Sequence, residues 1–124
     1  MKAYTNLEQS KELAKILPSK SADLCFQQVF EQHKTSYYKI EMIPYRFYSG
    51  ISIPSWSLVA LLGVIPKRIK EYNVLRIDIS EDDFAIWYDE IGYGVNNDLP
   101  NITTESPIDA CYEMIIHLHE QKLL

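Results

Sequence analysis

The sequence predicts a single α+β domain over residues 1–124, in which helices cover one face of a mainly antiparallel sheet of about four strands. Segments with helical spacing of apolar residues lie at the beginning, middle and end of the chain. One alternating segment lies between the first two of them, and two alternating segments lie between the last two. Short connections between the strands favour antiparallel pairing. A chain of 124 residues, 47% of them hydrophobic, can bury one substantial core. The expected order is α-β-β-α-β-β-α.

The first expected helix runs from about Asn6 to Leu17. Thr5 and Glu8 have the spacing of a capping box, and the apolar residues that follow share one helical face. Pro18 is expected to end this helix, because proline cannot continue the hydrogen-bond pattern. Residues 19–21 are then expected to form a loop, with a short turn over residues 21–23.

The next region contains one clear strand and one segment whose structure stays open. Residues 24–30 lack a clean period, so a strand and a helical turn are both possible. Polar residues 32–35 are expected to turn the chain. Tyr38, Ile40 and Met42 alternate with charged residues and predict a strand, which Pro44 ends or bends. Residues 45–48 are aromatic and extended in character, and residues 49–50 are expected to turn.

A second helix is expected from Ser55 to about Val64, before Pro66 blocks its continuation. Its apolar residues cover so much of its circumference that we expect it to be well buried. The basic residues at 67, 68 and 70 then form an exposed exit from this helix.

Two strands and a last helix complete the predicted fold. The alternation over residues 75–79 and 84–89 predicts two strands, and residues 80–83 read as their hairpin turn. Residues 92–104 are expected to be a long loop, with a short edge strand at its start as an alternative. Ser106 caps the last helix, which begins at Pro107 and runs through Leu118.

Charge and composition exclude several classes of protein. The net charge is −5 and uneven, with +2 over residues 1–62 and −7 over residues 63–124. This balance disfavours a general nucleic-acid binder, whose affinity comes from cationic side chains.

The longest apolar run is far shorter than a membrane-spanning helix needs, and the first residues lead into a polar helix. Two cysteines make no disulfide framework. We therefore expect a cytoplasmic protein with no membrane segment.

Three segments together resemble a known group of proteins. Residues 53–69, residues 106–120 and the opening residues 5–10 are similar to small uncharacterised proteins of gut Bacteroides-type bacteria and their mobile elements. Residues 25–47 and the loop after Gly92 lie outside this resemblance. The group has no known activity, so the resemblance carries no functional residue to this chain. It implies a cytoplasmic protein of bacterial or phage-related origin.

The residues that most often carry catalysis are present but do not converge. His117 and His119 are two apart, so they point to different faces of a helix and cannot chelate one metal ion together. Cys111 lies in the first turn of the last helix, where a thiolate is stabilised, and His33 or either other histidine would have to activate it. Because Cys111 also lies on the apolar face, burial in the core is the commoner outcome. We predict no metal and no cofactor.

Charged clusters offer two further alternatives. Carboxylates gather at residues 81–83 and 89–90, where a pair could do acid–base work, although solvation in a turn explains the first group. Gly92-Tyr93-Gly94 lacks the remaining glycine of a nucleotide-binding loop. Lys67, Arg68 and Lys70 could contact phosphate while the aromatic residues at 45, 47 and 48 stack bases.

The strongest binding candidates are Trp56, Trp87 and Tyr93. Trp87 lies on the opposite face of its strand from Phe84, Ile86 and Tyr88. If helices cover only the face of those three residues, Trp87 stands on the open side of the sheet. An aromatic side chain on an open face often marks a partner surface. Packing on neighbouring long side chains is the alternative for Trp87, and a place in the core is the alternative for Trp56. The leading hypothesis is a non-catalytic protein-interaction or accessory module that binds another protein or itself. A small hydrolase or transferase using Cys111 or a carboxylate, and a nucleic-acid-associated accessory factor, are the alternatives.

Overall fold

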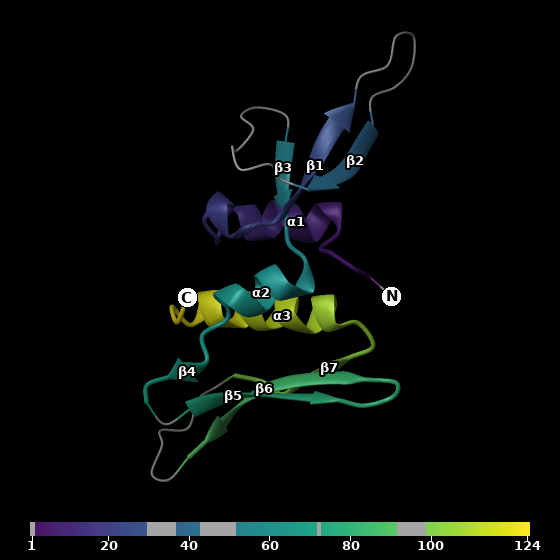
Figure 1. The fold of residues 1–124 in the computed structure, drawn as a ribbon. Helices are drawn as coiled ribbons and strands as arrows, with labels where there is room; N and C mark the ends of the chain where they lie inside the picture. Colours follow the sequence, from purple (N-terminus) through teal and green to yellow (C-terminus); the bar gives the residue numbers. More distant parts are fainter. Residues whose placement is uncertain (1, 30–36, 43–51, 72, 92–98) are drawn as a thin grey trace.

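The computed structural model of the chain describes residues 2–29, 37–42, 52–71, 73–91 and 99–124, and these form the predicted α+β architecture. The described elements are arranged in layers, with a sheet at each end and the helices between them (Figure 1). The sequence predicted one sheet of about four strands. The structure divides its strands between a three-stranded and a four-stranded sheet, and both are antiparallel.

The smaller sheet has the order β2-β1-β3 and is built from β1 (Leu24–Val29), β2 (Tyr37–Met42) and β3 (Ser52–Ser55). Of the segment over residues 24–30 that the sequence left open, residues 24–29 form a strand, and residue 30 lies outside the described residues. The strand expected around residues 38–42 is confirmed. β3 is a strand that the sequence pattern did not predict, and it includes Ser55, which was expected to begin a helix. Pro54 is tolerated because β3 lies at the edge of its sheet, where a missing N–H need not break a ladder.

The larger sheet has the order β4-β5-β6-β7, from β4 (Arg68–Ile69), β5 (Asn73–Ile79), β6 (Phe84–Glu90) and β7 (Ile102–Thr104). The predicted strands and hairpin are confirmed as β5, β6 and the turn closed by Ser80 N–H and Asp83 C=O at 2.9 Å. β4 and β7 were not predicted. β7 falls at the end of the expected loop over residues 92–104, not at its start. It forms because Ile102 lies opposite Ile86 and completes the buried face.

The first helix begins one residue later than its sequence indicated. α1 (Leu7–Ala14) is capped by Asn6, whose side chain and that of Gln9 form a reciprocal capping box. Thr5, expected to be the cap, is instead fully buried between α1 and β3. Its hydroxyl lies 2.7 Å from the Ser10 hydroxyl and 3.1 Å from that of Ser55.

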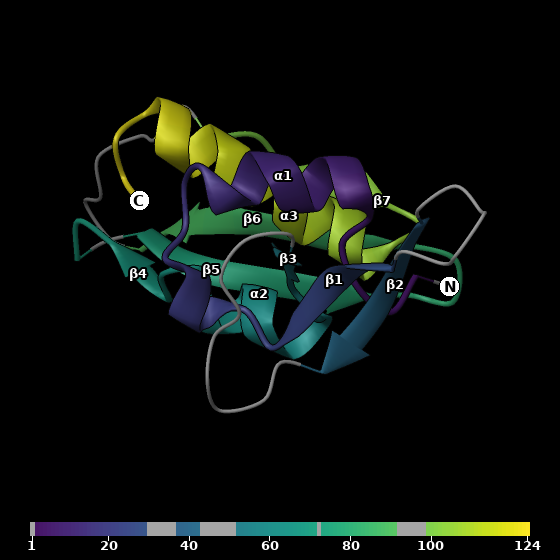
Figure 2. The same ribbon diagram turned by 90° about the horizontal axis from the view of Figure 1, so that it is seen from above.

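The other two helices lie side by side across the larger sheet (Figure 2). α2 (Leu58–Val64) is capped by Ser57, and α3 (Pro107–Glu120) is capped by Ser106, as predicted for the last helix. α3 provides the centre of the core, since six of its side chains are buried. They are Ile108, Ala110, Cys111, Met114, Ile115 and Leu118. The expectation that α2 is well buried is wrong: of its seven residues only Leu61 is buried.

Candidate functional site

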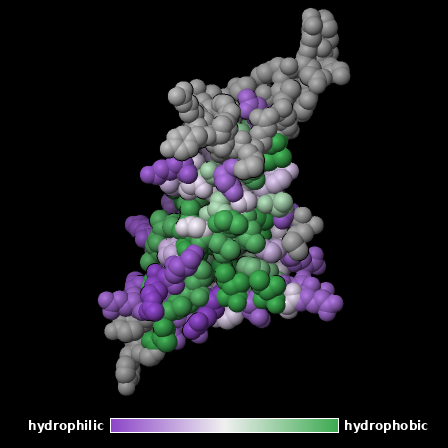
Figure 3. All heavy atoms as spheres, viewed as in Figure 1, coloured by the Kyte–Doolittle hydropathy of each residue, from purple (hydrophilic) through white to green (hydrophobic). Residues whose placement is uncertain are grey.

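Large apolar side chains are exposed on α2 and on the neighbouring end of β5. Val59 is 80% exposed, Ile79 75% and Ile77 38%. Together with Leu58 these side chains are called the apolar patch below. On the face of the molecule that carries α2, hydrophobic residues gather across the helix layer and the adjoining margin of the larger sheet (Figure 3). A concentrated apolar surface of this kind marks an interaction site more often than scattered apolar residues do.

Ile77 and Ile79 are exposed because β4 is too short to cover this end of β5. β4 pairs with β5 only at Asn73 and Val74, and one further bond joins Leu75 N–H to Lys67 C=O at 2.9 Å. Within the described residues, no strand continues this pairing along residues 76–79. Ile77 and Ile79 therefore lie at an open edge of the sheet, although they share its helix-facing side with the buried Ile86.

A hollow of about 260 Å³ adjoins the apolar patch at the β5–β6 hairpin. Its apolar lining comes from Leu58, Ile79, Phe84 and Pro107. The charged lining consists of four carboxylates, at Glu81, Asp82, Asp83 and Glu105. This acidic hollow has no basic side chain among its described lining residues, and no ion pair joins its carboxylates to the described part of the chain.

The three aromatic residues predicted to bind a partner are not brought together. Trp56 is fully buried, and its indole N–H donates to the Ser21 hydroxyl at 3.0 Å, so it belongs to the core and has no surface for a partner. Tyr93 lies outside the described residues. Trp87 lies on the opposite side of β6 from the buried Phe84, Ile86 and Tyr88, as the sequence predicted.

Trp87 has charged neighbours on that outer side. Arg76 lies directly opposite it on β5 and is 3.6 Å from the carboxylate of Asp89. Trp87 is partly buried, unlike the well-exposed Ile79. Packing against long neighbours, the alternative for Trp87, thus agrees better with its surroundings than an isolated aromatic anchor does.

Cys111 has no access to a substrate. Its side chain is fully buried in α3, and burial raises its pKa from the ordinary 9.0 to about 12, against a smaller lowering by the charge of Lys67. A cysteine nucleophile reacts as the thiolate, which this environment disfavours. The hydrolase or transferase alternative based on Cys111 therefore loses its nucleophile.

The remaining candidates for chemistry are dispersed over the surface. His117 lies 3.9 Å from Glu120, His119 is exposed, and His33 is outside the described residues. Among the residues whose placement is described, no group of three histidines, cysteines or carboxylates could hold a metal ion. The carboxylates of residues 89–90 are exposed on β6.

Two of the basic residues considered for nucleic-acid binding bind the main chain nearby. The Lys67 ammonium donates to the carbonyls of Leu62 and Ile65 at the end of α2, and Arg68 donates to the Glu71 carbonyl at 3.2 Å. Lys67 thus caps a helix whose terminal carbonyls lack partners. The aromatic residues at 45, 47 and 48 lie outside the described residues.

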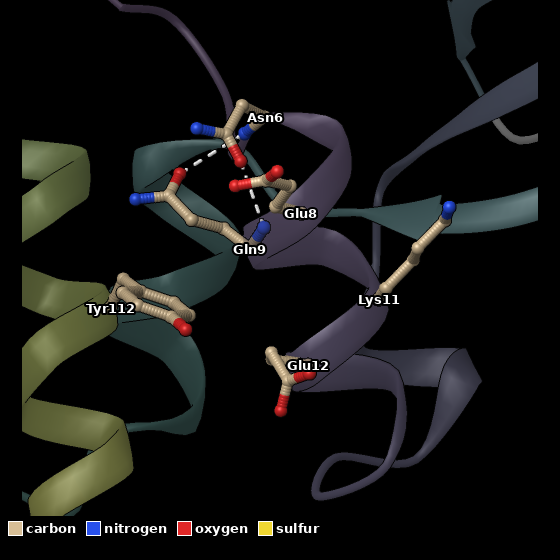
Figure 4. Close-up of a pocket in the computed structure, with 6 residues that line it drawn as sticks. All are labelled: Asn6, Glu8, Gln9, Lys11, Glu12 and Tyr112. Carbon is tan, nitrogen blue, oxygen red and sulfur yellow. Dashed lines mark hydrogen bonds between the residues drawn. The ribbon is translucent and has the colours of Figure 1, made fainter.

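A second, more open groove lies between α1 and α3 (Figure 4). Asn6 and Gln9 line it, but their side chains are occupied by the capping box of α1. Lys11 projects away from Tyr112 on the far side. Burial and then the charges of Glu12 and Glu8 raise the pKa of Tyr112, so its hydroxyl stays protonated. The groove contains no pairing of an activated nucleophile with a base.

The sequence pattern did not predict the apolar patch, although it contained one signal of it. The alternation of Leu75, Ile77 and Ile79 indicates only which side of the strand is apolar, not how far the helices extend over it. The apolar composition of residues 58–64 did contain a signal, because a helix this apolar exposes some of its side chains unless it is enclosed on all sides.

Comparison with protein-family models, with curated proteins and with solved structures found no match to this chain. The resemblance to small bacterial and mobile-element proteins therefore stays a prediction. None of the helices in the described ranges is long and apolar enough to cross a bilayer.

Proposed function

We propose that this chain is a cytoplasmic, non-catalytic interaction module that binds another polypeptide through the apolar patch. The observation that carries the proposal is the exposure of Val59 and Ile79, at 80% and 75%, on α2 and β5. Leu58 and Ile79 line the same hollow, so α2 and β5 contribute to one continuous surface. Covering such a surface removes apolar area from water, at about 25 cal/mol per Å² before the costs of association.

Two further observations favour this function over the alternatives. The deep burial of Cys111 counts against a thiol enzyme, and the net charge of −5 counts against a nucleic-acid-associated factor. A bacterial or phage-related origin, which the sequence resemblance implies, belongs to the same proposal.

Site-specific crosslinking tests the proposed function. A photo-crosslinking amino acid is placed at Val59 in one variant and at Lys15 in another, and both are irradiated in extracts of the source organism. Lys15 is a matched control, because it is also exposed but lies at the C-terminal end of α1, as its C-cap residue. We expect a discrete crosslinked product from position 59 alone. Light scattering of the purified protein then separates self-association from binding of a different chain.

Equal crosslinking from the two positions would overturn the proposal, because contact with a partner would then not be specific to the apolar patch. Absence of any product from position 59 in a correctly folded protein would overturn it as well. Circular dichroism of each variant establishes the fold before irradiation.

A further inference from the structure

At its open edge, the main chain of β5 presents hydrogen-bonding groups that have no strand partner among the described residues. Leu75 N–H points toward β4, as its bond to Lys67 shows, whereas Ser80 N–H points toward β6. Because these groups alternate along a strand, the N–H and C=O of Ile77 and Ile79 point away from β6. Within the described chain no strand accepts them. An open edge of this kind is a template for an added strand.

The side chains at this edge determine what an added strand must carry. Ile77 and Ile79 lie on the helix-facing side of β5, beside the apolar residues of α2. Every second side chain of an added strand would therefore contact the apolar patch. The side chains between them would lie on the outer side with Arg76 and Asp78, where polar residues are tolerated.

The acidic hollow determines the charge of one end of the added strand. The hollow begins at Ile79, the last residue of β5, and four carboxylates line it. A segment that continues past Ile79 reaches this hollow. Lysine or arginine there would bring its aliphatic stem to the apolar lining and its charge to the carboxylates.

A second copy of this chain fits the same edge poorly. If two β5 strands paired so that Arg76 of each faced Asp78 of the other, Ile79 of one copy would lie opposite Leu75. This pairing is blocked, because the position beside Leu75 is already occupied by Lys67 of the same chain. Shifting the register by one pair of residues avoids Lys67 but sets the two Asp78 side chains opposite each other, which is destabilising.

We propose that the partner adds an extended segment to β5 alongside Ile77 and Ile79, with apolar residues alternating along it and lysine or arginine at the end next to the acidic hollow. This inference rests on the proposed function, since it specifies how the apolar patch is covered and by which chemistry. Main-chain hydrogen bonds supply the general affinity, while the apolar and basic side chains supply the selectivity.

Synthetic peptides test the inference directly. Each peptide has ten residues in which valine alternates with threonine. One lysine peptide carries three lysines at its N-terminal end and another carries them at its C-terminal end. Two matched peptides carry three glutamates at the same positions. Fluorescence anisotropy is measured with the full chain at low salt. We expect the better lysine peptide to bind at least tenfold more tightly than its glutamate counterpart. Methylating the peptide nitrogens that face the edge should reduce its affinity by a similar factor.

Two variants of the protein complete the test. Ile79→Asp should abolish binding, whereas Thr103→Asp, which adds the same charge at an exposed position on β7, should leave most of it. The combined variant E81Q/D82N/D83N/E105Q should remove the preference for lysine and most of the salt dependence. Circular dichroism confirms that each variant is folded.

Failure of the inference can be told apart from failure of the proposed function. The inference would be overturned if the lysine peptide and its glutamate counterpart bound equally well, or if the lysine peptides did not bind. It would also be overturned if methylation of the peptide nitrogens left the affinity unchanged. If crosslinking from Val59 still succeeded, the apolar patch would remain a binding surface of another kind. If that crosslinking failed too, both proposals would be wrong.

Discussion

The phenol of Tyr88 donates a 2.6 Å hydrogen bond to the main-chain carbonyl of Pro66. Tyr88 belongs to β6 in the larger sheet, and Pro66 lies in the connection that leaves α2. The bond therefore joins the sheet to the helix that carries half of the apolar patch. Burial raises the pKa of Tyr88 well above its ordinary value, so the hydroxyl remains a donor throughout the physiological range.

Replacing Tyr88 with phenylalanine should lower the free energy of unfolding by about 1–2 kcal/mol, because the Pro66 carbonyl loses its partner in a partly buried place. Urea denaturation measures the change. Tyr112→Phe is the matched control, since the Tyr112 hydroxyl has no hydrogen bond to a described residue, and its effect should be much smaller. A loss as large in the control would show that the Tyr88 bond is not the cause.

The helix starts illustrate what could be predicted from the sequence. Ser106, Pro107 and the apolar residues after them predicted α3 at its correct first residue, because capping depends on neighbours in the chain alone. Thr5 was a plausible cap for the same local reason. Its hydroxyl bonds instead to Ser10 and Ser55, and Ser55 is fifty residues away, so no local pattern could reveal this contact.

The division into two sheets depends on similarly distant contacts. Phe26 lies opposite Ile40 on one side and Ile53 on the other, and this pairing closes the smaller sheet without β5 or β6. Strand alternation predicts which residues share a face but not which strands pair. The candidate site was hidden for the same reason, since the exposure of Ile79 depends on where β4 ends. Trp87, in contrast, was placed on the correct side of the sheet by alternation alone.

The buried hydroxyl cluster of Thr5, Ser10 and Ser55 should be important for stability. The Thr5 hydroxyl also accepts the Trp56 main-chain N–H at 3.1 Å, so Thr5→Val leaves several buried polar groups without this partner. We expect a loss of about 2–3 kcal/mol in the free energy of unfolding, which denaturant titration measures. Thr103→Val, at an exposed position, is the control. A neutral effect of Thr5→Val would mean that water replaces the hydroxyl.

Alkaline pH should destabilise the protein through Cys111. In the unfolded chain the thiol loses its proton near pH 9.0, whereas in the folded protein its pKa is raised to about 12. The folded state thus binds more protons in this range, and its stability, complete below pH 9, falls as the pH rises. The slope approaches about 1.4 kcal/mol per pH unit for one group. Urea titrations between pH 9 and pH 10 should show a shallower slope for Cys111→Ala. Equal slopes would contradict the burial of this thiol.

The apolar patch should contribute little to the stability of the folded chain, and this separates a binding surface from a core. Val59 and Ile79 are mostly exposed, so replacing each with serine should change the free energy of unfolding by less than about 0.5 kcal/mol. Ile86 is fully buried on the same side of the sheet, and Ile86→Ala should cost about 2–5 kcal/mol. Thermal and urea denaturation measure all three variants. Ile79→Ser should also lose the partner crosslinked from position 59 while it keeps its fold. If either serine replacement destabilised the protein as much as Ile86→Ala does, that residue would belong to the core and not to a binding surface.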